Sequence, residues 1–397
     1  MLHLAQELIN TYGSPLYVYN APTLRETIAR ITQAIPYPRT HLHFATVTNG
    51  NIALLQIFQQ AGWGLHANTP GDIYLGLKAG FLPSQIVYSG SNLNSTEMEQ
   101  VLTWGVTTLN LDSIAQLQLF CQVYQTLAGT EHTIPRLGLR LNLPDVTGDS
   151  RIGVRPNEFP EAIAIAAAAG LTISGLHFYR GTGTNATPAF TQVIDTVIDT
   201  AQTLPDWQYL DFGGGFGYPY HNGKVAFDWP LFGAELSQRL SIRGREIDLI
   251  VEPGRAAIAG CGTLLARVVS VKWQDSKQVV GVDTSIANLA VLSVHGGYRE
   301  IITCKEDREV TQSPLHPTDI CGNTTYSRDY LGKNCQLPAL AIGDIIAILD
   351  VGAYGYAMSS HFLHRPRPAE ILLDNSQHKL IRQREYYSVL LDNQVFN

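Results

Sequence analysis

The stretch from residue 41 to residue 67, HLHFATVTNGNIALLQIFQQAGWGLHA, contains the pattern that decides the fold. Residues 41–48 form a β-rich run with alternating side-chain character, and residues 64–67 form a second one. Between them, residues 52–60 carry apolar side chains at the spacing of one helix face. The stretch therefore predicts a strand, a helix and a second strand in succession.

The same alternation continues to about residue 255. Eight strands are expected, at residues 41–48, 64–67, 86–89, 107–111, 136–141, 175–179, 209–212 and 249–252. Helices are expected between strands, for example at residues 52–60, 70–79, 95–104 and 158–169. Eight such units over roughly 230 residues fit an α/β fold with a closed (β/α)8 barrel, whose chemistry sits at the carboxyl ends of the strands. A doubly wound open sheet is the alternative that this pattern leaves open.

The sequence after residue 255 has a different texture. Short strand-like runs, separated by Gly, Pro, Asn and Asp, predict an all-β domain, and they lie at residues 264–272, 278–282, 300–302, 342–349, 369–373 and 380–382. The run at residues 16–19 could supply a strand to the barrel, although residues 1–22 are grouped with the β domain. We therefore expect a barrel of residues 23–255 and a β domain of residues 1–22 and 256–397.

Composition excludes several classes of protein. The 397 residues include 27 Lys and Arg against 34 Asp and Glu, a net charge of −7 without a basic block, so no nucleic-acid partner is expected. No apolar run reaches the ~18 residues of a membrane helix, and a cytoplasmic protein is expected. Five cysteines lie scattered without a Cys-x-x-Cys pair, which predicts reduced thiols: Cys121, Cys261, Cys304, Cys321 and Cys335.

Eight short motifs occur in a characteristic order. They are Gly13-Ser-Pro-Leu-Tyr-Val-Tyr19, Leu77-Lys-Ala-Gly-Phe81, Asn110-Leu-Asp-Ser113, Leu139-Arg-Leu-Asn142, Gly213-Gly-Gly-Phe216, Glu252-Pro-Gly-Arg255, Gly352-Ala-Tyr354 and Arg365-Pro-Arg-Pro-Ala-Glu370. With them the chain resembles the diaminopimelate/ornithine decarboxylases, fold type III enzymes that use pyridoxal 5′-phosphate (PLP), and is most similar to the diaminopimelate branch. The resemblance implies an alanine racemase-like barrel followed by a C-terminal all-β domain.

The cofactor side of the family pattern is present in this sequence. Gly213, Gly214 and Gly215 follow an expected strand, where they would let backbone N–H groups approach an anion closely. The resemblance assigns Arg255 and Tyr354 to the phosphate and Glu252, in the same motif as Gly254, to the pyridine nitrogen. A tight turn, a surface ion pair and a core tyrosine are the alternative explanations for these residues.

The position that would bind the cofactor covalently departs from the family pattern. The first barrel strand of the family ends in a Tyr-Ala-Val-Lys-Ala-Asn type motif, whose lysine forms the Schiff base with PLP. Residues 43–51 here read HFATVTNGN, and alignment on the flanking alanine and asparagines places Val47 at that lysine. A branched alkyl group cannot form an imine, and the nearest lysine in the sequence is Lys78, on an expected helix.

Residues around the ring also depart from the pattern. The family's stacking histidine and phosphate-binding serine correspond to Tyr179 and Thr182, and a phenol ring can still stack while a threonine can still donate a hydrogen bond. Both are therefore expected to bind the cofactor. At the end of the second strand, His66 replaces an acid on the substrate side, and an imidazole cannot mimic that carboxylate.

The β domain has lost the family's catalytic and substrate-binding groups. The motif that supplies a cysteine and an acid reads GNTTYSRD at residues 322–329, which places Thr325 at the cysteine and Tyr326 at the acid. Val291 stands at the arginine that binds the substrate carboxylate in the diaminopimelate branch, and His295 stands at a substrate-side tyrosine. Carbanion protonation by a thiol is therefore expected to be absent.

These differences favour a protein that retains a site for PLP or a PLP-like phosphate ligand, bound non-covalently, and that is atypical or inactive as a decarboxylase. The ligand could also be a PLP–amino-acid adduct, which forms spontaneously in solution. A non-catalytic partner or regulator of a true decarboxylase, and a working diaminopimelate-type decarboxylase, are the alternatives. The resemblance also implies an isologous homodimer in which the loop at residues 322–329 enters the other subunit's barrel.

Metal-assisted chemistry is a further alternative. His43, His66 and His177 could converge inside the barrel, because inward-facing residues on a strand recur at every second position. No acidic ligand that would complete the set is evident from the sequence. Packed core histidines are therefore favoured, and no metal site is predicted.

Overall fold

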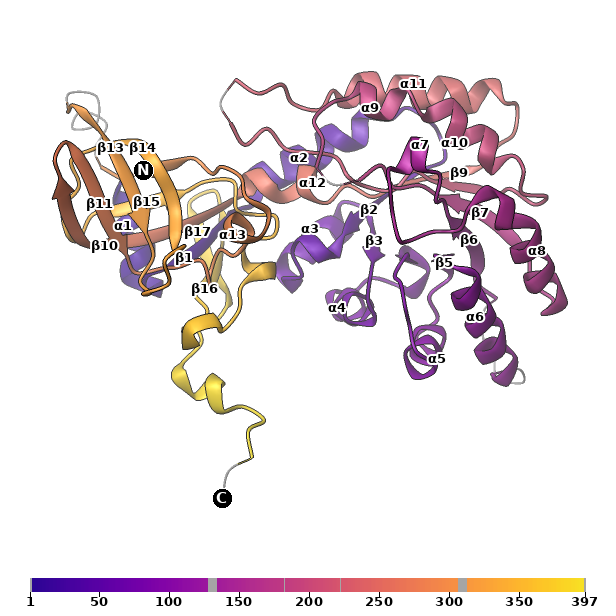
Figure 1. Cartoon of the computed structure of the whole chain (residues 1–397), viewed down its shortest axis with the longest axis horizontal. Coiled ribbons are helices and arrows are strands. Elements are labelled where there is room, and N and C mark those ends of the chain that lie inside the picture. Colours follow the sequence, from indigo (N-terminus) through magenta and orange to yellow (C-terminus); the bar gives the residue numbers. More distant parts are fainter. Residues whose placement is uncertain (1, 128–133, 182, 222, 306–312, 396–397) are drawn as a thin grey trace. The chain divides into compact units, whose positions relative to one another are not determined.

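A computed structural model describes residues 2–127, 134–181, 183–221, 223–305 and 313–395 (Figure 1). The chain divides into two compact units. The barrel unit consists of Arg25–Pro219 and Val225–Ala257, and the β unit consists of Met1–Leu24, Tyr220–Lys224 and Ile258–Asn397. Within the described residues, no helix is both long and apolar enough to cross a membrane.

Eight parallel strands form a closed barrel, in the order in which they occur along the chain. They are β2 (Thr40–Ala45), β3 (Gly64–Ala67), β4 (Ile86–Tyr88), β5 (Thr108–Leu111), β6 (Arg136–Arg140), β7 (Ile173–His177), β8 (Tyr209–Asp211) and β9 (Asp248–Val251). Pairing of Thr40 with Leu249 joins the last strand to the first. The (β/α)8 barrel is therefore confirmed, and the open-sheet alternative is wrong because the sheet has no edge.

Amphipathic helices lie outside the strands (Figure 1). The longer ones are α2 (Ala21–Ala34), α3 (Ile52–Gln60), α4 (Pro70–Ala79), α5 (Ser95–Thr103), α6 (Ile114–Thr126), α8 (Phe159–Ala168), α10 (Ile194–Ala201) and α11 (Trp229–Ile242). Helix α10 shows why they pack, because its buried residues Ile194, Val197, Ile198 and Ala201 follow the i, i+3, i+4 and i+7 spacing.

Side-chain caps fix the points where the chain leaves a strand and enters a helix. The side chain of Asn51 accepts a hydrogen bond from Ala53 N at the start of α3. Thr69 and Asp72 form a reciprocal capping box at the start of α4. Such caps satisfy N–H groups that have no partner within the helix. Because each of these helices begins just beyond a strand, the capped turns line the carboxyl end of the barrel, which we call the barrel mouth.

The interior of the barrel is filled by alternate side chains of each strand. The ring of Tyr209 occupies its centre, and a Cβ added at Gly175 would lie 2.0 Å from the Tyr209 Cζ. The Tyr209 hydroxyl donates to Asn110 Oδ1 at 2.9 Å. Buried polar side chains continue from this bond toward the mouth, which is where the sequence predicts the chemistry.

The β unit is built on a nine-stranded sheet whose main path runs β14-β13-β11-β10-β1-β16-β17, with β15 pairing β10 and β12 pairing β15. Its strands are β1 (Leu16–Asn20), β10 (Gly262–Gln274), β11 (Lys277–Val282), β12 (Ile301–Thr303), β13 (Leu315–Cys321), β14 (Tyr330–Pro338), β15 (Ile345–Ile348), β16 (Ala369–Asp374) and β17 (Gln377–Arg382). Helices α1 (Leu2–Tyr12) and α13 (Val291–His295) belong to the same unit. An all-β domain after the barrel is thus confirmed as the main architecture.

Two strand predictions in the β unit require correction. Strand β1 pairs with β10 and β16, so the suggestion that residues 16–19 supply a barrel strand is wrong. Strands β13 and β14 were not predicted, since proline, glycine and charged residues break their apolar pattern. Buried Gln278 explains their stability, because its Nε2 donates to Thr318 Oγ1 and to Pro338 O, each at 2.9 Å.

Two barrel strands end two or three residues earlier than predicted, and both changes affect the mouth. Strand β2 ends at Ala45, and Thr46–Thr48 form a 3-10 turn, η1, in which Thr48 Oγ1 donates to Ala45 O at 2.8 Å. Strand β7 ends at His177, so Tyr179 lies in the loop beyond it. Val47 and Tyr179 are therefore loop residues at the mouth.

Candidate cofactor site at the barrel mouth

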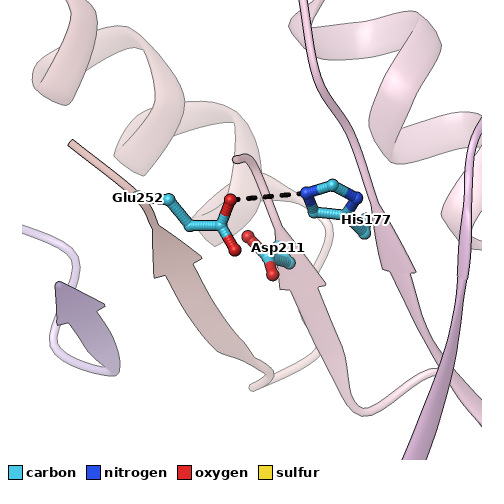
Figure 2. Close-up of side chains that lie close together, drawn as sticks. All are labelled: His177, Asp211 and Glu252. Carbon is cyan, nitrogen blue, oxygen red and sulfur yellow. Dashed lines mark hydrogen bonds and ion pairs between the residues drawn. The ribbon is translucent and has the colours of Figure 1, made fainter. Parts of the chain in front are cut away.

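Glu252 lies at the centre of the barrel mouth, directly after β9, and is 2% exposed. Its Oε2 lies 3.4 Å from His177 Nε2, and its Oε1 lies 3.4 Å from His66 Nε2. Figure 2 shows the contact with His177. Burial raises the pKa of Glu252 to about 7, although a hydrogen bond with Asp211 and the charge of Arg140 oppose the rise. The carboxyl group is therefore able to hold or release a proton near neutral pH.

Asp211 lies beside Glu252, at the end of β8 (Figure 2). Asn110 Nδ2 donates to its Oδ2 at 2.9 Å, and Gly213 N donates to its Oδ1 at 3.0 Å. Burial, and then the adjacent charge of Glu252, raise the pKa of Asp211 well above its usual range. Two adjacent buried carboxyl groups do not ionise together readily, so this pair retains a proton.

The two histidines that flank Glu252 are uncharged. Burial lowers the pKa of His177 to about 4 and lowers that of His66 well below its usual range. Among the described residues, neither ring nitrogen of His66 has a hydrogen-bond partner. Glu252 Oε1 also lacks one among these residues. Buried polar atoms without partners are rare in folded proteins, so this set is open to a ligand. A ring N–H group would satisfy Glu252 Oε1, which fits the pyridine nitrogen of PLP.

The loop after β8 forms a cradle without side chains. Gly213 and Gly215 have φ values of +65° and +98°. A Cβ added at Gly215 would lie 2.2 Å from Gly181 O, and one added at Gly213 would lie 2.0 Å from Phe178 O. The glycines therefore let the loops after β7 and β8 run closely against each other, with no side chain between them. Such backbone is suited to binding an anion.

Arg255 supplies a positive charge beside this cradle. It is the first residue of the short helix α12 (Arg255–Ile258). A Cβ added at Gly183 would lie 3.5 Å from Arg255 Nε, and Gly183 N donates to Gly215 O at 3.0 Å. The guanidinium thus lies against the same pair of loops as Gly213–Gly215. Thr182, the predicted hydroxyl donor, lies outside the described residues.

Val47 lies in a turn packed against the loop that carries Glu252. A Cβ added at Gly254 would lie 2.7 Å from Thr48 Cγ2, and Ala45 N donates to Pro253 O at 3.4 Å. Gly254 therefore permits close approach of the two loops. From the sequence, only a cofactor-binding role was predicted for it. Val47 itself is 45% exposed.

The sequence of the barrel unit contains a single lysine, Lys78. It lies in the last turn of α4, where its Nζ is 5.4 Å from the centre of the Tyr74 ring. Because α4 begins at the mouth, its last turn lies toward the amino ends of the strands. The barrel unit therefore supplies no lysine amine at its mouth.

A cation and an aromatic ring complete the mouth. Arg140 ends β6, and its Cζ lies 5.2 Å from the centre of the partly exposed Tyr179 ring. No role was predicted from the sequence for Arg140, Asp211 or Asn110. The alternation of side chains along each strand could have predicted that all three face the barrel interior. Their proximity to Glu252 depends on closure of the barrel and could not be read from spacing along the chain.

The three histidines considered as metal ligands do not all converge. His43 lines a pocket with Arg136 and Asp248, the first residues of β6 and β9, at the end of the barrel opposite the mouth. His177, Asp211 and Glu252 do offer atoms within 4.8 Å of one another. However, both Asp211 oxygens already accept hydrogen bonds. The cluster is better explained as a support for Glu252.

The remaining predicted site residues lie in the β unit. Val291 begins α13 and is 2% exposed, whereas His295 ends the same helix and is exposed. Thr325 and Tyr326 are exposed in a loop. Tyr354 has a φ of +59° in a turn between β15 and β16.

Comparison with known proteins identifies the family. A model described as "Pyridoxal-dependent decarboxylase, pyridoxal binding domain" matches residues 22–259. The chain belongs to this decarboxylase family. It is 32% identical to the diaminopimelate decarboxylase of Methanothermobacter thermautotrophicus, over 98% of this chain and 94% of the relative. Among solved structures, diaminopimelate decarboxylase from Helicobacter pylori complexed with L-lysine is 26% identical, with a TM-score of 0.88 over 98% of each chain.

Two matches from Aquifex aeolicus extend this comparison. The diaminopimelate decarboxylase of that organism is 30% identical over 98% of this chain and 93% of the relative. The crystal structure of AQ1208 from A. aeolicus is 28% identical, has a TM-score of 0.87 and covers 98% of this chain and 93% of that one. The resemblance to fold type III PLP decarboxylases is therefore confirmed over nearly the whole chain.

Proposed function

We propose that this decarboxylase-family chain binds PLP or a PLP-like phosphate ligand non-covalently at the barrel mouth, and that it is atypical or inactive as a diaminopimelate decarboxylase. One contrast carries the proposal. Glu252, the glycine cradle and Arg255 form a site suited to a phosphorylated pyridine, whereas the turn packed against Glu252 carries Val47. We assign Val47 to the position of the family lysine on the strength of the flanking residues.

The barrel's own residues have separate tasks in this proposal. Backbone N–H groups of Gly214 and Gly215 and the Arg255 guanidinium bind the phosphate, whereas Gly213, whose N–H donates to Asp211, shapes the turn. Glu252 accepts a hydrogen bond from the ring nitrogen, with His66 and His177 limiting the rotation of its carboxylate. The Tyr179 ring covers a face of the ligand. When bound, PLP supplies an electron sink for chemistry next to an amino nitrogen.

Thr182 and Tyr354 remain proposed phosphate ligands, and the β-unit residues remain proposed replacements for lost groups. With Thr325 in place of a cysteine, that position offers an alcohol, which is a far weaker acid than a thiol. Since the barrel unit supplies no lysine amine at its mouth, it offers no covalent route of its own. We therefore expect this chain to bind the ligand without turning over a substrate at the family's rate.

Equilibrium dialysis against PLP, followed by an assay of carbon dioxide release from diaminopimelate, tests this function. We expect saturable binding of about one PLP per chain that dialysis fully reverses. Carbon dioxide release should stay at the background level under conditions in which the M. thermautotrophicus relative turns over. Turnover comparable to that relative would support the alternative of a working decarboxylase and would contradict the proposal.

We also propose that the chain forms an isologous homodimer through the loop at residues 322–329. Asp329 is buried and orders this loop, because its carboxylate accepts hydrogen bonds from Ile286 N at 3.0 Å and from Thr324 N at 3.1 Å. Tyr326 is 39% exposed and packs edge-on against Phe362, which is also exposed. An ordered loop that presents aromatic side chains is typical of an interface.

Light scattering tests the assembly directly. The dimer should have twice the 43.6 kDa mass of the chain, and Tyr326→Ser should shift the equilibrium toward monomer. In the dimer we place Thr325 and Tyr326 near the partner subunit's Val47. A strict monomer at micromolar concentration would contradict this proposal while leaving the ligand proposal intact.

A further inference from the structure

Arg140 is a cation at the barrel mouth without an anionic partner. Within the part of the chain that the structure describes, no carboxylate oxygen lies within 4.0 Å of its guanidinium and its side chain donates no hydrogen bond, the Tyr179 ring being its recorded contact. Burial lowers the pKa of Arg140, while Glu252, Tyr179, Asp112 and Asp211 oppose that effect from a distance. The guanidinium is thus partly desolvated but unpaired.

A second arginine on the same strand provides the comparison. Arg136 lies four residues earlier, on the same face of β6, and its Nη1 contacts Asp248 Oδ2 at 2.6 Å. Arg136, at the amino end of β6, is therefore paired with a carboxylate. Arg140, at the mouth, is not paired with one among the described residues. Desolvating a cation costs free energy unless an anion approaches it. An anionic group of a ligand would supply that partner at Arg140.

The phosphate site follows a strand that is not a neighbour of the strand carrying Arg140. Arg140 on β6 pairs in register with His177 on β7, which pairs with Asp211 on β8, just before the glycine cradle. Strand β7 thus lies between the strand that carries Arg140 and the strand that leads to the cradle, a backbone separation of roughly 9 to 10 Å. His66 contributes no negative charge, because burial keeps its imidazole neutral. A ligand whose phosphate occupies the cradle therefore needs a second anionic group to reach Arg140.

We propose that Arg140 binds the carboxylate of an amino-acid portion of the ligand, so that the natural ligand class is a phosphopyridoxyl–amino acid conjugate rather than PLP alone. This inference rests on the proposed phosphate-ligand function. The planar guanidinium matches a carboxylate with two parallel hydrogen bonds. Condensation of the PLP aldehyde with an α-amine releases water and occurs in solution, so capture of the conjugate requires no lysine of the protein.

Two stable probes isolate the carboxylate contact. N-phosphopyridoxyl-L-alanine carries the carboxylate, and N-phosphopyridoxyl-ethylamine is the same molecule without it. Calorimetric titration should show that the wild type binds the alanine probe about 10- to 100-fold more tightly, the range expected for hydrogen bonds between charged groups. Arg140→Gln should remove this preference while binding the ethylamine probe within about 3-fold of the wild type.

The surface variant Arg243→Gln is the matched control, since Arg243 contacts Asp195 and Asp199 on the outer helices, and it should keep the full preference. Equal binding of the two probes by the wild type, or an unchanged preference in Arg140→Gln, would overturn the carboxylate assignment alone. Failure of PLP and of both probes to bind would instead contradict the proposed phosphate-ligand function.

Discussion

Two sides of the barrel mouth differ in what they offer a ligand. The side formed by the ends of β8 and β9 presents the glycine turn at residues 213–215, Arg255 and a buried carboxyl group, Glu252. The side formed by the ends of β2 and β3 presents an alkyl group, Val47, and a neutral imidazole, His66. The first side suits a phosphorylated ring, and the second offers no amine and no carboxylate. Holding a ligand and reacting with it are therefore tasks of different strands.

The barrel explains why these tasks can separate. Its closure depends on backbone pairing and on alternate inward side chains such as Tyr209, and a loop residue such as Val47 contributes to neither. A substitution there changes the chemistry at little cost to the fold. Glu252, in contrast, is held by contacts from several strands, so its loss would affect the packing of the whole mouth.

The largest expected effect comes from adding an amine to the β2 side. Val47→Lys should convert reversible PLP binding into an attachment that borohydride makes permanent, from no label to about one per chain. Peptide mapping after reduction is the measurement. Val47→Met, similar in bulk but without an amine, should remain unlabelled. A Val47→Lys protein that binds PLP but stays unlabelled would show that residue 47 does not face the ligand.

The Glu252 side should show a characteristic dependence of stability on pH. Burial raises the pKa of Glu252 from 4.5 to about 7, so the folded state binds a proton that the unfolded state releases between these values. Its contribution to stability is complete below about pH 4.5 and is lost as the pH rises through about 7, a change of about 3 kcal/mol.

Urea unfolding of the wild type and Glu252→Gln between about pH 4 and pH 8 measures this change. Asp211, His66 and His177 are present in both proteins, so the difference in free energy of unfolding reports on Glu252 together with its effect on Asp211, whose pKa Glu252 raises. The wild type should lose free energy of unfolding relative to Glu252→Gln as the pH rises. A difference that does not change with pH would mean that Glu252 is not a buried proton carrier.

The phosphate contact should give the next largest effect. Arg255→Ala should weaken PLP binding by about 1.5 to 3 kcal/mol, the range for a hydrogen bond to a charged group. Equilibrium dialysis measures it, and Arg243→Ala on the outer surface should leave the affinity unchanged. If Arg255→Ala and the wild type bind PLP equally, the phosphate lies elsewhere.

The smallest expected effect compares the glycine cradle with a glycine that also has a positive φ but has open surroundings. Gly215→Ala should lower the free energy of unfolding by roughly 1 to 3 kcal/mol, because its φ is +98° and its Cβ would lie 2.2 Å from Gly181 O. Gly244→Ala shares the positive φ, +67°, but has open space around it, and should cost about 1 kcal/mol or less. Thermal unfolding of both variants measures the difference, and equal losses would mean that the loops are not closely packed.

Features formed by neighbouring residues in the chain were predicted well. Contacts that depend on closure of the barrel were not. The eight barrel strands and the Gly213–Gly215 turn could be predicted, because periodicity and contiguous motifs encode them. The hydrogen bonds from Asn110 to Asp211, and the position of Arg140, could not, since they join strands that are far apart in the chain. Strand β13 was missed for a related reason, because a buried glutamine on β11 stabilises it.

Borohydride reduction of the wild-type protein saturated with PLP, followed by peptide mapping, tests the central claim most directly. The account predicts full loss of PLP on dialysis after reduction and no pyridoxyl group on a lysine of the barrel unit, whose sequence contains Lys78 as its single lysine. A stoichiometric pyridoxyl label on any lysine of the chain would contradict it.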